Sequence, residues 1–344
     1  MWDVASNAGL YDQRLALEWV RFNIHRFGGD HTKVTVIGES AGGGSIMAHL
    51  SAFGGIDGSS PFQRAIIQSP AIKPATTAAR YSQVFEQFTR IANVTGYAQA
   101  RELSSEQLQT INGQMAAESA FADTVFGPNV DGILIPDEPI RLAAQRKVDE
   151  AVKVIVAHNA NEGLLFTNPD VQDEAAFKQF FQNLMPNVPS QKINTIASDI
   201  YPPDFSGVQP YRTMTQRLSL AVGDALFTCN SFAISLAYSN MTRGYLFDIC
   251  PGMHGQDVSY TFFNGERADS LGLLVDRPTA GKMQSWFVDF TIFGDASGSS
   301  ATQLPVFGSG AQVAHINGGT TFPSVQDPAA SARCRFWLNG FSGN

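Results

Sequence analysis

A short glycine-rich pentapeptide carries the clearest chemistry in the sequence. Gly38-Glu39-Ser40-Ala41-Gly42 has the G-x-S-x-G form of a nucleophile elbow, a sharp turn between a strand and a helix. The glycines two residues before and after Ser40 are expected to leave room for this turn, which exposes the serine hydroxyl. The backbone N–H of Ala41 would then face the negative charge that develops when Ser40 attacks a carbonyl group. A glycine-rich turn without chemistry is the alternative interpretation of the pentapeptide.

A serine of this kind needs an acid and then a histidine later in the chain. Glu162 is the leading acid, because it lies in a polar turn a few residues after the apolar stretch Lys153–Ala157. Active-site residues follow the carboxyl ends of parallel strands, so this position suits a catalytic acid. An ordinary solvated loop glutamate is the alternative.

The histidine that completes the set is chosen by its place among six. Four lie too early, beside the elbow or before the acid: His25, His31, His49 and His158. Of the remaining two, His315 lies in a Gly/Ser-rich region without a clear preceding strand. His254 follows the apolar stretch Tyr245–Ile249, in a loop able to bring an imidazole over Ser40. We therefore predict that His254 is the general base; a loop histidine with a structural hydrogen bond stays as the alternative.

The elements around these residues follow the order of an α/β sheet. Apolar residues recur at three- and four-residue steps from about Leu10 to Phe27, which predicts a helix ended by Gly28-Gly29. Continuous apolar runs predict buried strands, and these runs are Val34–Ile37, Arg64–Gln68, Lys153–Ala157 and Tyr245–Ile249. We expect mostly helical insertions at about 76–150 and 171–240, within one domain that spans residues 1–344, since no linker clearly divides the chain.

The composition excludes several classes of protein. With 44% hydrophobic and 16% charged residues, the chain fits a globular enzyme with a large apolar interior. A net charge of −8 and the lack of a Lys/Arg cluster argue against a nucleic-acid partner. No apolar run approaches the roughly 18 residues of a membrane span, and no Cys/His spacing suggests a metal site. The three cysteines allow one internal disulfide, whose pairing stays open: Cys229, Cys250 and Cys334.

With these sites in hand, the chain resembles the type-B carboxylesterase family, which includes cholinesterases and fungal lipases. The segments that carry the resemblance are Asn7–Val20 and Phe27–Asp30 before the elbow, Gly38–Gly42 itself, Asn161–Gly163, His254-Gly255, and Trp286–Phe290 with Phe293–Asp295. Arg333–Trp337 looks most like the fungal members. The match spans nearly the whole chain.

The resemblance implies an α/β-hydrolase fold, with a mostly parallel central sheet and helices on both faces. It also implies a carboxylic ester hydrolase that acts on a small-molecule ester through a Ser-Glu-His triad and an acyl-enzyme, and needs no cofactor. Glu39 resembles an acidic residue that borders the pocket in this family, and Ser69 resembles a pocket-wall serine. A plain elbow residue and a strand cap, respectively, are the alternatives.

One feature of the family has no counterpart in the sequence. A His-Gly-Gly-Gly-type loop normally lies upstream of the nucleophile and supplies N–H groups to the oxyanion, and no segment before Ser40 forms one. We therefore expect that the N-terminal part of the fold is missing. As written, the chain should be a poor esterase and marginally soluble, because Val34–Ile37 would form an open sheet edge and Ala41 alone would hold the oxyanion.

Two other hypotheses compete with an active esterase. The chain could be an inactive truncated fragment, or a cholinesterase-like interaction module that kept the fold and lost catalysis. Retention of Ser40, Glu162 and His254 in the correct order argues against the module. The resemblance suggests an extracellular location, although the chain as written starts without the pattern of a signal peptide.

Overall fold

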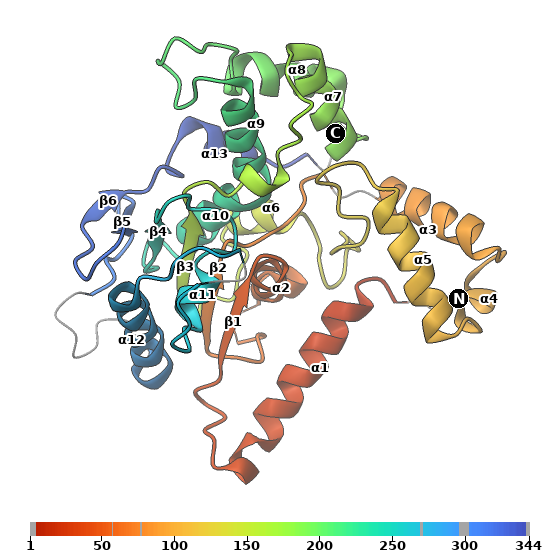
Figure 1. Cartoon of the computed structure of the whole chain (residues 1–344). Coiled ribbons are helices and arrows are strands. Elements are labelled where there is room, and N and C mark those ends of the chain that lie inside the picture. Colours follow the sequence, from red (N-terminus) through yellow and green to blue (C-terminus); the bar gives the residue numbers. More distant parts are fainter. Residues whose placement is uncertain (1–4, 57, 76–77, 269–270, 296–302, 342–344) are drawn as a thin grey trace.

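A six-stranded sheet organises the chain (Figure 1). The computed structural model describes residues 5–56, 58–75, 78–268, 271–295 and 303–341. The strands follow one another across the sheet in chain order: β1 Thr35–Glu39, β2 Arg64–Gln68, β3 Lys153–Asn159, β4 Tyr245–Phe247, β5 Gln312–Ile316 and β6 Ser324–Gln326. β1 to β5 are parallel and β6 is antiparallel to β5. The predicted mostly parallel sheet is confirmed.

The predicted strands match the observed ones closely, with two omissions. Arg64–Gln68 has the predicted bounds, and the other three differ by a few residues at one or both ends. β5 and β6 were not predicted. β5 has the polar, half-buried residues Gln312 and His315 among its buried apolar ones, so it is not a continuous apolar run, and β6 is short and largely exposed. His315, for which we saw no clear preceding strand, itself lies on a strand.

Helices occupy both of the segments expected to be helical. Those of residues 76–150 are α3 Ala78–Ala92, α4 Tyr97–Arg101, α5 Ser105–Ala117 and α6 Pro139–Ala144. Those of residues 171–240 are α7 Glu174–Leu184, α8 Ser190–Thr195, α9 Met214–Gly223 and α10 Cys229–Ala237. The remaining helices are α1 Ala8–Asn23, α2 Ala41–Leu50, α11 Val258–Thr261, α12 Arg277–Phe293 and α13 Ala332–Trp337.

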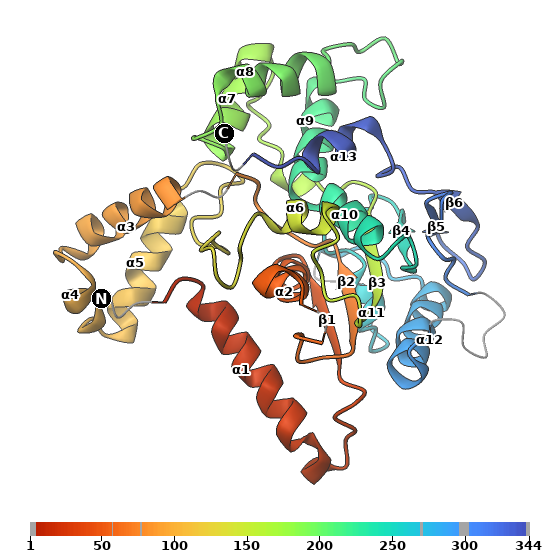
Figure 2. The same cartoon turned by 180° about the vertical axis from the view of Figure 1, so that it is seen from behind.

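Helices cover both faces of the sheet (Figure 2). Alternate strand residues point to opposite faces, so Ala65 and Ile67 of β2 pack with α2, α6 and α10, whereas Ile66 packs with α11 and α12. On α12 the side chains of Met283, Trp286, Phe287 and Phe290 are buried, but that of Phe293 at its end is 65% exposed. β2 and β3 are therefore covered on both faces, as is typical of parallel sheets.

The N-terminal helix lies apart from these two layers (Figure 1). Helix α1 ends at Asn23, and a 3₁₀ turn at Ile24–Phe27 completes the predicted helical stretch before Gly28, whose φ of 81° turns the chain. Leu10 is the buried residue of α1 and packs beside Ala48 of α2. Gln13, Arg14 and Leu17 add further contacts. Helix α1 is therefore held to the rest of the chain along roughly its first two and a half turns, about ten residues at about 3.6 residues per turn.

One helical segment is long and apolar enough to cross a membrane. It is Met214–Ala237, in which a π-helical turn at Asp224–Thr228 joins α9 to α10, and a window of 18 residues within it has a mean hydropathy of 1.4. Because 83% of that window is buried inside the protein, its composition is that of a core helix.

Candidate active site

Ser40 lies between β1 and α2 in a strained backbone conformation. Its φ of 56° and ψ of −121° are unusual for a residue with a side chain, and such strain often marks a functional position. The turn is held by Gly44 N and Ala71 N, which both donate to the Ser40 carbonyl oxygen at 2.9 Å. A Cβ at Gly38 would lie 2.5 Å from the Gly42 carbonyl carbon, so glycine is required there. At Gly42 itself a Cβ would meet open space, which corrects our expectation of crowding on both sides.

His254 lies between the predicted nucleophile and the predicted acid. Its Nε2 is 2.8 Å from Ser40 Oγ, and its Nδ1 is 2.6 Å from Glu162 Oε2. The rings of Phe227 and Phe166 flank the imidazole, with centroids 4.1 Å and 5.3 Å away. The structure therefore brings together the three residues nominated from the sequence, in a shielded corner where the ring has little freedom.

The second carboxylate oxygen of Glu162, which does not contact His254, is also hydrogen-bonded. Oε1 accepts hydrogen bonds from Ser69 Oγ and from Asn159 N, both at 2.6 Å. Gly163 packs so closely against α9 that a Cβ there would lie 1.9 Å from Ser219 O. Ser69 is fully buried beside Glu162 and is not among the described residues that line the cavity at Ser40, so its role as a pocket-wall residue stays a prediction.

Opposing effects set the protonation of the histidine. Burial lowers the pKa of His254, but the hydrogen bond and negative charge of Glu162 outweigh it and hold that pKa above its ordinary value. Glu39 adds to the rise, because its Oε1 lies 3.2 Å from His254 Nε2. Burial raises the pKa of Glu39 itself to about 7; the charge of His254 opposes this rise, and Asp257 and Glu162 add to it. The protonation of Glu39 and that of His254 therefore depend on each other.

A buried polar network behind His254 was not predicted from the sequence. Asp257 Oδ2 accepts hydrogen bonds from Gln68 Nε2 at 2.9 Å and from Tyr245 Oη at 2.7 Å. Asn159 Nδ2 donates to Met253 O at 2.6 Å, which ties the end of β3 to the loop of His254. The one sequence signal is that Gln68 and Asn159 are polar residues at the carboxyl ends of buried strands.

A cavity of about 220 Å³ opens at Ser40 and Ala41. Phe166 and Phe227 form part of its apolar wall, and Lys73 and Arg80 also line it. Glu39 is not among its described lining residues, which places the carboxylate beside His254 and outside this cavity. The site thus combines a half-buried serine that borders the cavity, a histidine held by a carboxylate, and adjoining space for a small apolar group.

Known proteins resemble this chain in both sequence and structure. A profile described as the carboxylesterase family matches residues 2–337. The chain belongs to the carboxylesterase family. It is 35% identical to carboxylesterase patB of Penicillium expansum, over 96% of this chain and 58% of that protein, and 36% identical to patB of Aspergillus clavatus, over 96% and 59%. The crystal structure of Aspergillus niger EstA superposes with a TM-score of 0.80 at 26% identity, over 97% of this chain and 69% of that one.

The comparisons confirm the predicted family and the α/β-hydrolase fold. A PNB esterase structure, at 24% identity and a TM-score of 0.75, shows the same fold. This carboxylesterase-family chain spans a little under three fifths of the length of the curated relatives named above.

Three other histidines of this carboxylesterase-family chain have structural partners. His315 Nε2 lies 2.7 Å from Asp248 Oδ2, and His49 Nε2 lies 3.1 Å from Gln13 Oε1. His158 is buried with its Nε2 2.9 Å from Asp327 Oδ1, and although burial opposes it, this carboxylate raises the pKa of His158 to about 9. Each imidazole therefore contributes to local structure and lacks contact with Ser40.

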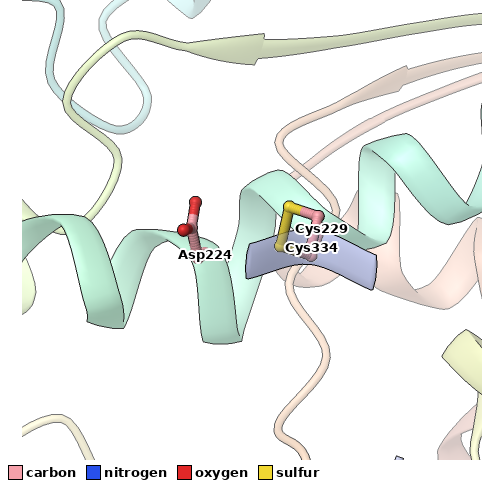
Figure 3. Close-up of side chains that lie close together, drawn as sticks. All are labelled: Asp224, Cys229 and Cys334. Atoms are coloured by element: carbon pink, nitrogen blue, oxygen red, sulfur yellow. A yellow bond between two sulfur atoms is a disulfide. The ribbon is translucent and has the colours of Figure 1, made fainter. Parts of the chain in front are cut away.

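The cysteines settle the pairing that the sequence left open (Figure 3). Cys229 of α10 and Cys334 of α13 form a disulfide, and Cys250 is free. Asp224 lies beside the disulfide, but its Oδ2 accepts hydrogen bonds from Tyr201 Oη and Arg333 Nε. Because the sulfur atoms are bonded to each other, they cannot act as thiolate ligands of a metal. The disulfide and the Arg333–Asp224 ion pair instead join α13 to the segment of α10.

Proposed function

We propose that the chain is a carboxylic ester hydrolase in which Ser40, His254 and Glu162 act as a triad through an acyl-enzyme intermediate. The observation that carries the proposal is the continuous series of hydrogen bonds from Ser40 Oγ through the imidazole to the Glu162 carboxylate. With Nδ1–H donated to Glu162, Nε2 is left to accept the serine proton. Family membership adds support, since ester hydrolysis is the chemistry that its name denotes.

In the first half of the reaction Ser40 Oγ attacks the ester carbonyl carbon while its proton passes to His254 Nε2. The carbonyl electron pair moves to the oxygen, where the Ala41 N–H at the start of α2 would donate to it; the partial positive charge of the helix N-terminus adds stabilisation. Collapse of this intermediate breaks the bond to the alcohol oxygen. That oxygen takes the proton from His254 and leaves the acyl group on Ser40.

The second half repeats these steps with water. His254 Nε2 accepts a proton from the water molecule as its oxygen attacks the acyl carbon. The bond from that carbon to Ser40 Oγ then breaks, Ser40 regains the proton, and the carboxylic acid departs. Glu162 stabilises the imidazolium in both halves, and Ser69 keeps the carboxylate in place.

Covalent labelling tests the assignment of the nucleophile. A fluorophosphonate should form one adduct, located at Ser40 by peptide mass spectrometry, and Ser40→Ala should abolish both the adduct and esterase activity, a loss of several orders of magnitude. Ser45 is the matched control, because it also lines the cavity but its Oγ donates to Ala41 O. Ser45→Ala should still be labelled at Ser40. An adduct that persists in Ser40→Ala would contradict the proposal.

A further inference from the structure

His158 is a buried histidine near the end of β3 that takes no part in the proposed proton transfers. Its Nε2 lies 2.9 Å from Asp327 Oδ1, and its Nδ1 lies 3.1 Å from the carbonyl oxygen of Asn159. Asp327 comes from the turn between β6 and α13, and the side chains of this ion pair are only 3% and 5% exposed. The imidazole therefore joins the end of a central strand to a distant part of the chain.

Both partners of this ring are hydrogen-bond acceptors. The Asn159 carbonyl oxygen and the ionised Asp327 carboxylate can accept a hydrogen bond but cannot donate one. A neutral imidazole has a single N–H, so its other nitrogen would face an oxygen without a hydrogen between them. An imidazolium has an N–H on each nitrogen and makes both contacts as hydrogen bonds. The geometry therefore requires His158 to be a buried cation.

Carboxylates from three segments lie around this cation: Asp327 after β6, Glu162 after β3, and Asp224 between α9 and α10. Burial lowers the pKa of His158, but the charge and hydrogen bond of Asp327, the charge of Glu162 and the backbone carbonyl together raise it to about 9. Burial raises the pKa of Asp224, and the charges of Arg333 on α13 and of His158 oppose that rise. The surrounding charges thus agree with the protonation that the hydrogen bonds require.

Asn159 connects His158 to the acid and to the histidine of the proposed triad. The Asn159 N–H donates to Glu162 Oε1 at 2.6 Å. Its Nδ2 donates to the carbonyl oxygen of Met253, the residue before His254, at 2.6 Å. The position of Asn159 therefore influences both the carboxylate and the loop that carries the base, and a proton on His158 Nδ1 helps to set that position.

We propose that His158, held as an imidazolium by Asp327, is a positioning residue for the triad. Its Nδ1–H fixes the Asn159 peptide, which in turn places the Glu162 carboxylate. When the ring loses one proton, the N–H toward Asp327 is kept, because a hydrogen bond to a charged acceptor is the stronger one. Nδ1 then has no hydrogen to donate to Asn159. The effect on rate rests on the proposed ester hydrolysis, whereas the protonation of the ring can be measured without turnover.

The first test measures that protonation by nitrogen NMR of isotopically labelled histidine. The signals of His158 are assigned by their loss in His158→Gln. At about pH 7.5 both ring nitrogens should have the chemical shifts of protonated nitrogens, and the ring should titrate at about pH 9. An unprotonated ring nitrogen at about pH 7.5 would overturn the inference, whatever the protein hydrolyses.

The second test is the alkaline limb of the profile of kcat/KM against pH, measured with p-nitrophenyl butyrate after subtraction of spontaneous hydrolysis. In the unaltered protein the rate should fall several-fold as pH rises through about 9, where His158 titrates. Asp327→Asn keeps an acceptor oxygen but removes the charge that retains the proton. The titration and the limb should therefore both move to lower pH, by about one unit. A limb that stays in place in folded Asp327→Asn, or that does not coincide with the titration of His158, would overturn the positioning role.

Asp248→Asn is the matched control for this substitution. Asp248 also binds a histidine, since its Oδ2 lies 2.7 Å from His315 Nε2, and the change should leave the limb where it is. Because the pKa of His158 is raised by folding, the ion pair stabilises the fold at neutral pH, and this stability is lost as pH rises through about 9. Melting curves at each pH therefore show where the protein is folded, and rates are compared there.

Two further outcomes are decided by the unaltered protein. Where Asp327→Asn does not fold, the coincidence of the alkaline limb with the titration of His158 is the remaining criterion. If the unaltered protein neither hydrolyses esters nor is labelled at Ser40, while both nitrogens of His158 are protonated, the proposed hydrolysis is overturned. The positioning role is then overturned with it, and the charged state of His158 stands.

Discussion

Two regions of the molecule differ in which side chains they bury. Around Glu162 and His254, most polar groups are buried and hydrogen-bonded. The Glu162 carboxylate has three such partners: the Ser69 hydroxyl, the Asn159 N–H and the His254 imidazole. Along α1, large apolar side chains face outward instead: Leu15 is 67% exposed and Phe22 is 71% exposed. Ile37 on β1, the first strand in the sheet order, is 42% exposed.

Substitutions near Glu162 and His254 and substitutions on α1 should therefore have different consequences. The buried corner is costly to desolvate, and it is stable because each donor meets an acceptor, so a change there should alter chemistry as well as folding. The α1 surface has no such constraint. A change there should leave the reaction intact and alter how molecules associate. Substitutions in the two regions can therefore be compared directly.

The largest effect is expected at the buried corner. His254→Ala removes the base and Glu162→Gln removes the charge that stabilises the imidazolium, so each should lower turnover of p-nitrophenyl butyrate about 10³-fold or more. The affinity for substrate should change little. Where turnover is too slow to measure, the rate of fluorophosphonate labelling at Ser40 gives the same comparison.

The control for this prediction is the other late histidine. His315 binds Asp248 at 2.7 Å on β5, so His315→Ala should keep its rate within about twofold. Full activity in His254→Ala together with loss of activity in His315→Ala would reverse our choice of base.

A smaller effect, on the pH dependence of kcat/KM, is expected when Glu39 is replaced by glutamine. The Glu39 carboxylate lies 3.2 Å from His254 Nε2 and favours the imidazolium, which cannot accept the Ser40 proton. Replacing it by glutamine removes one cause of the raised pKa of His254. The acidic limb of the profile of kcat/KM against pH should therefore move to lower pH, and the variant should be a few-fold faster than the unaltered protein on that limb.

The measurement is a full pH profile with p-nitrophenyl butyrate for both proteins. Glu118→Gln, which removes an exposed carboxylate after α5, should leave the limb where it is. A limb that stays in place, or moves to higher pH, in Glu39→Gln would show that this carboxylate does not act on His254.

Local sequence signals predicted much of the fold, because they require few long-range contacts. The continuous apolar run of β2 and the ordered motif around Ser40 could be identified from the chain alone. β5 was missed because the polar residues Gln312 and His315 interrupt its apolar run. The support of Glu162 by Ser69 joins residues from two strands, and the Lys73–Asp123 pair joins two loops, so neither has a signature in the sequence. Such contacts depend on tertiary packing and need a structure to be seen.

The smallest effect on catalysis is expected on α1, where the effect on association should be the largest. Leu15 and Phe22 lie two turns apart on the helix and are both mostly exposed, so they form part of an apolar surface that water contacts. Replacing both by glutamine should lower light scattering and shift the chain toward monomer in size-exclusion chromatography. Stability should change by roughly 0.5 kcal/mol or less, because exposed positions contribute little to packing. Leu10→Gln is the matched control: Leu10 is 7% exposed and packs against α2, so the same chemical change there should destabilise the protein by about 2–5 kcal/mol in thermal melts. If the double variant associates as strongly as the unaltered chain, the exposed face of α1 is not a surface through which molecules associate.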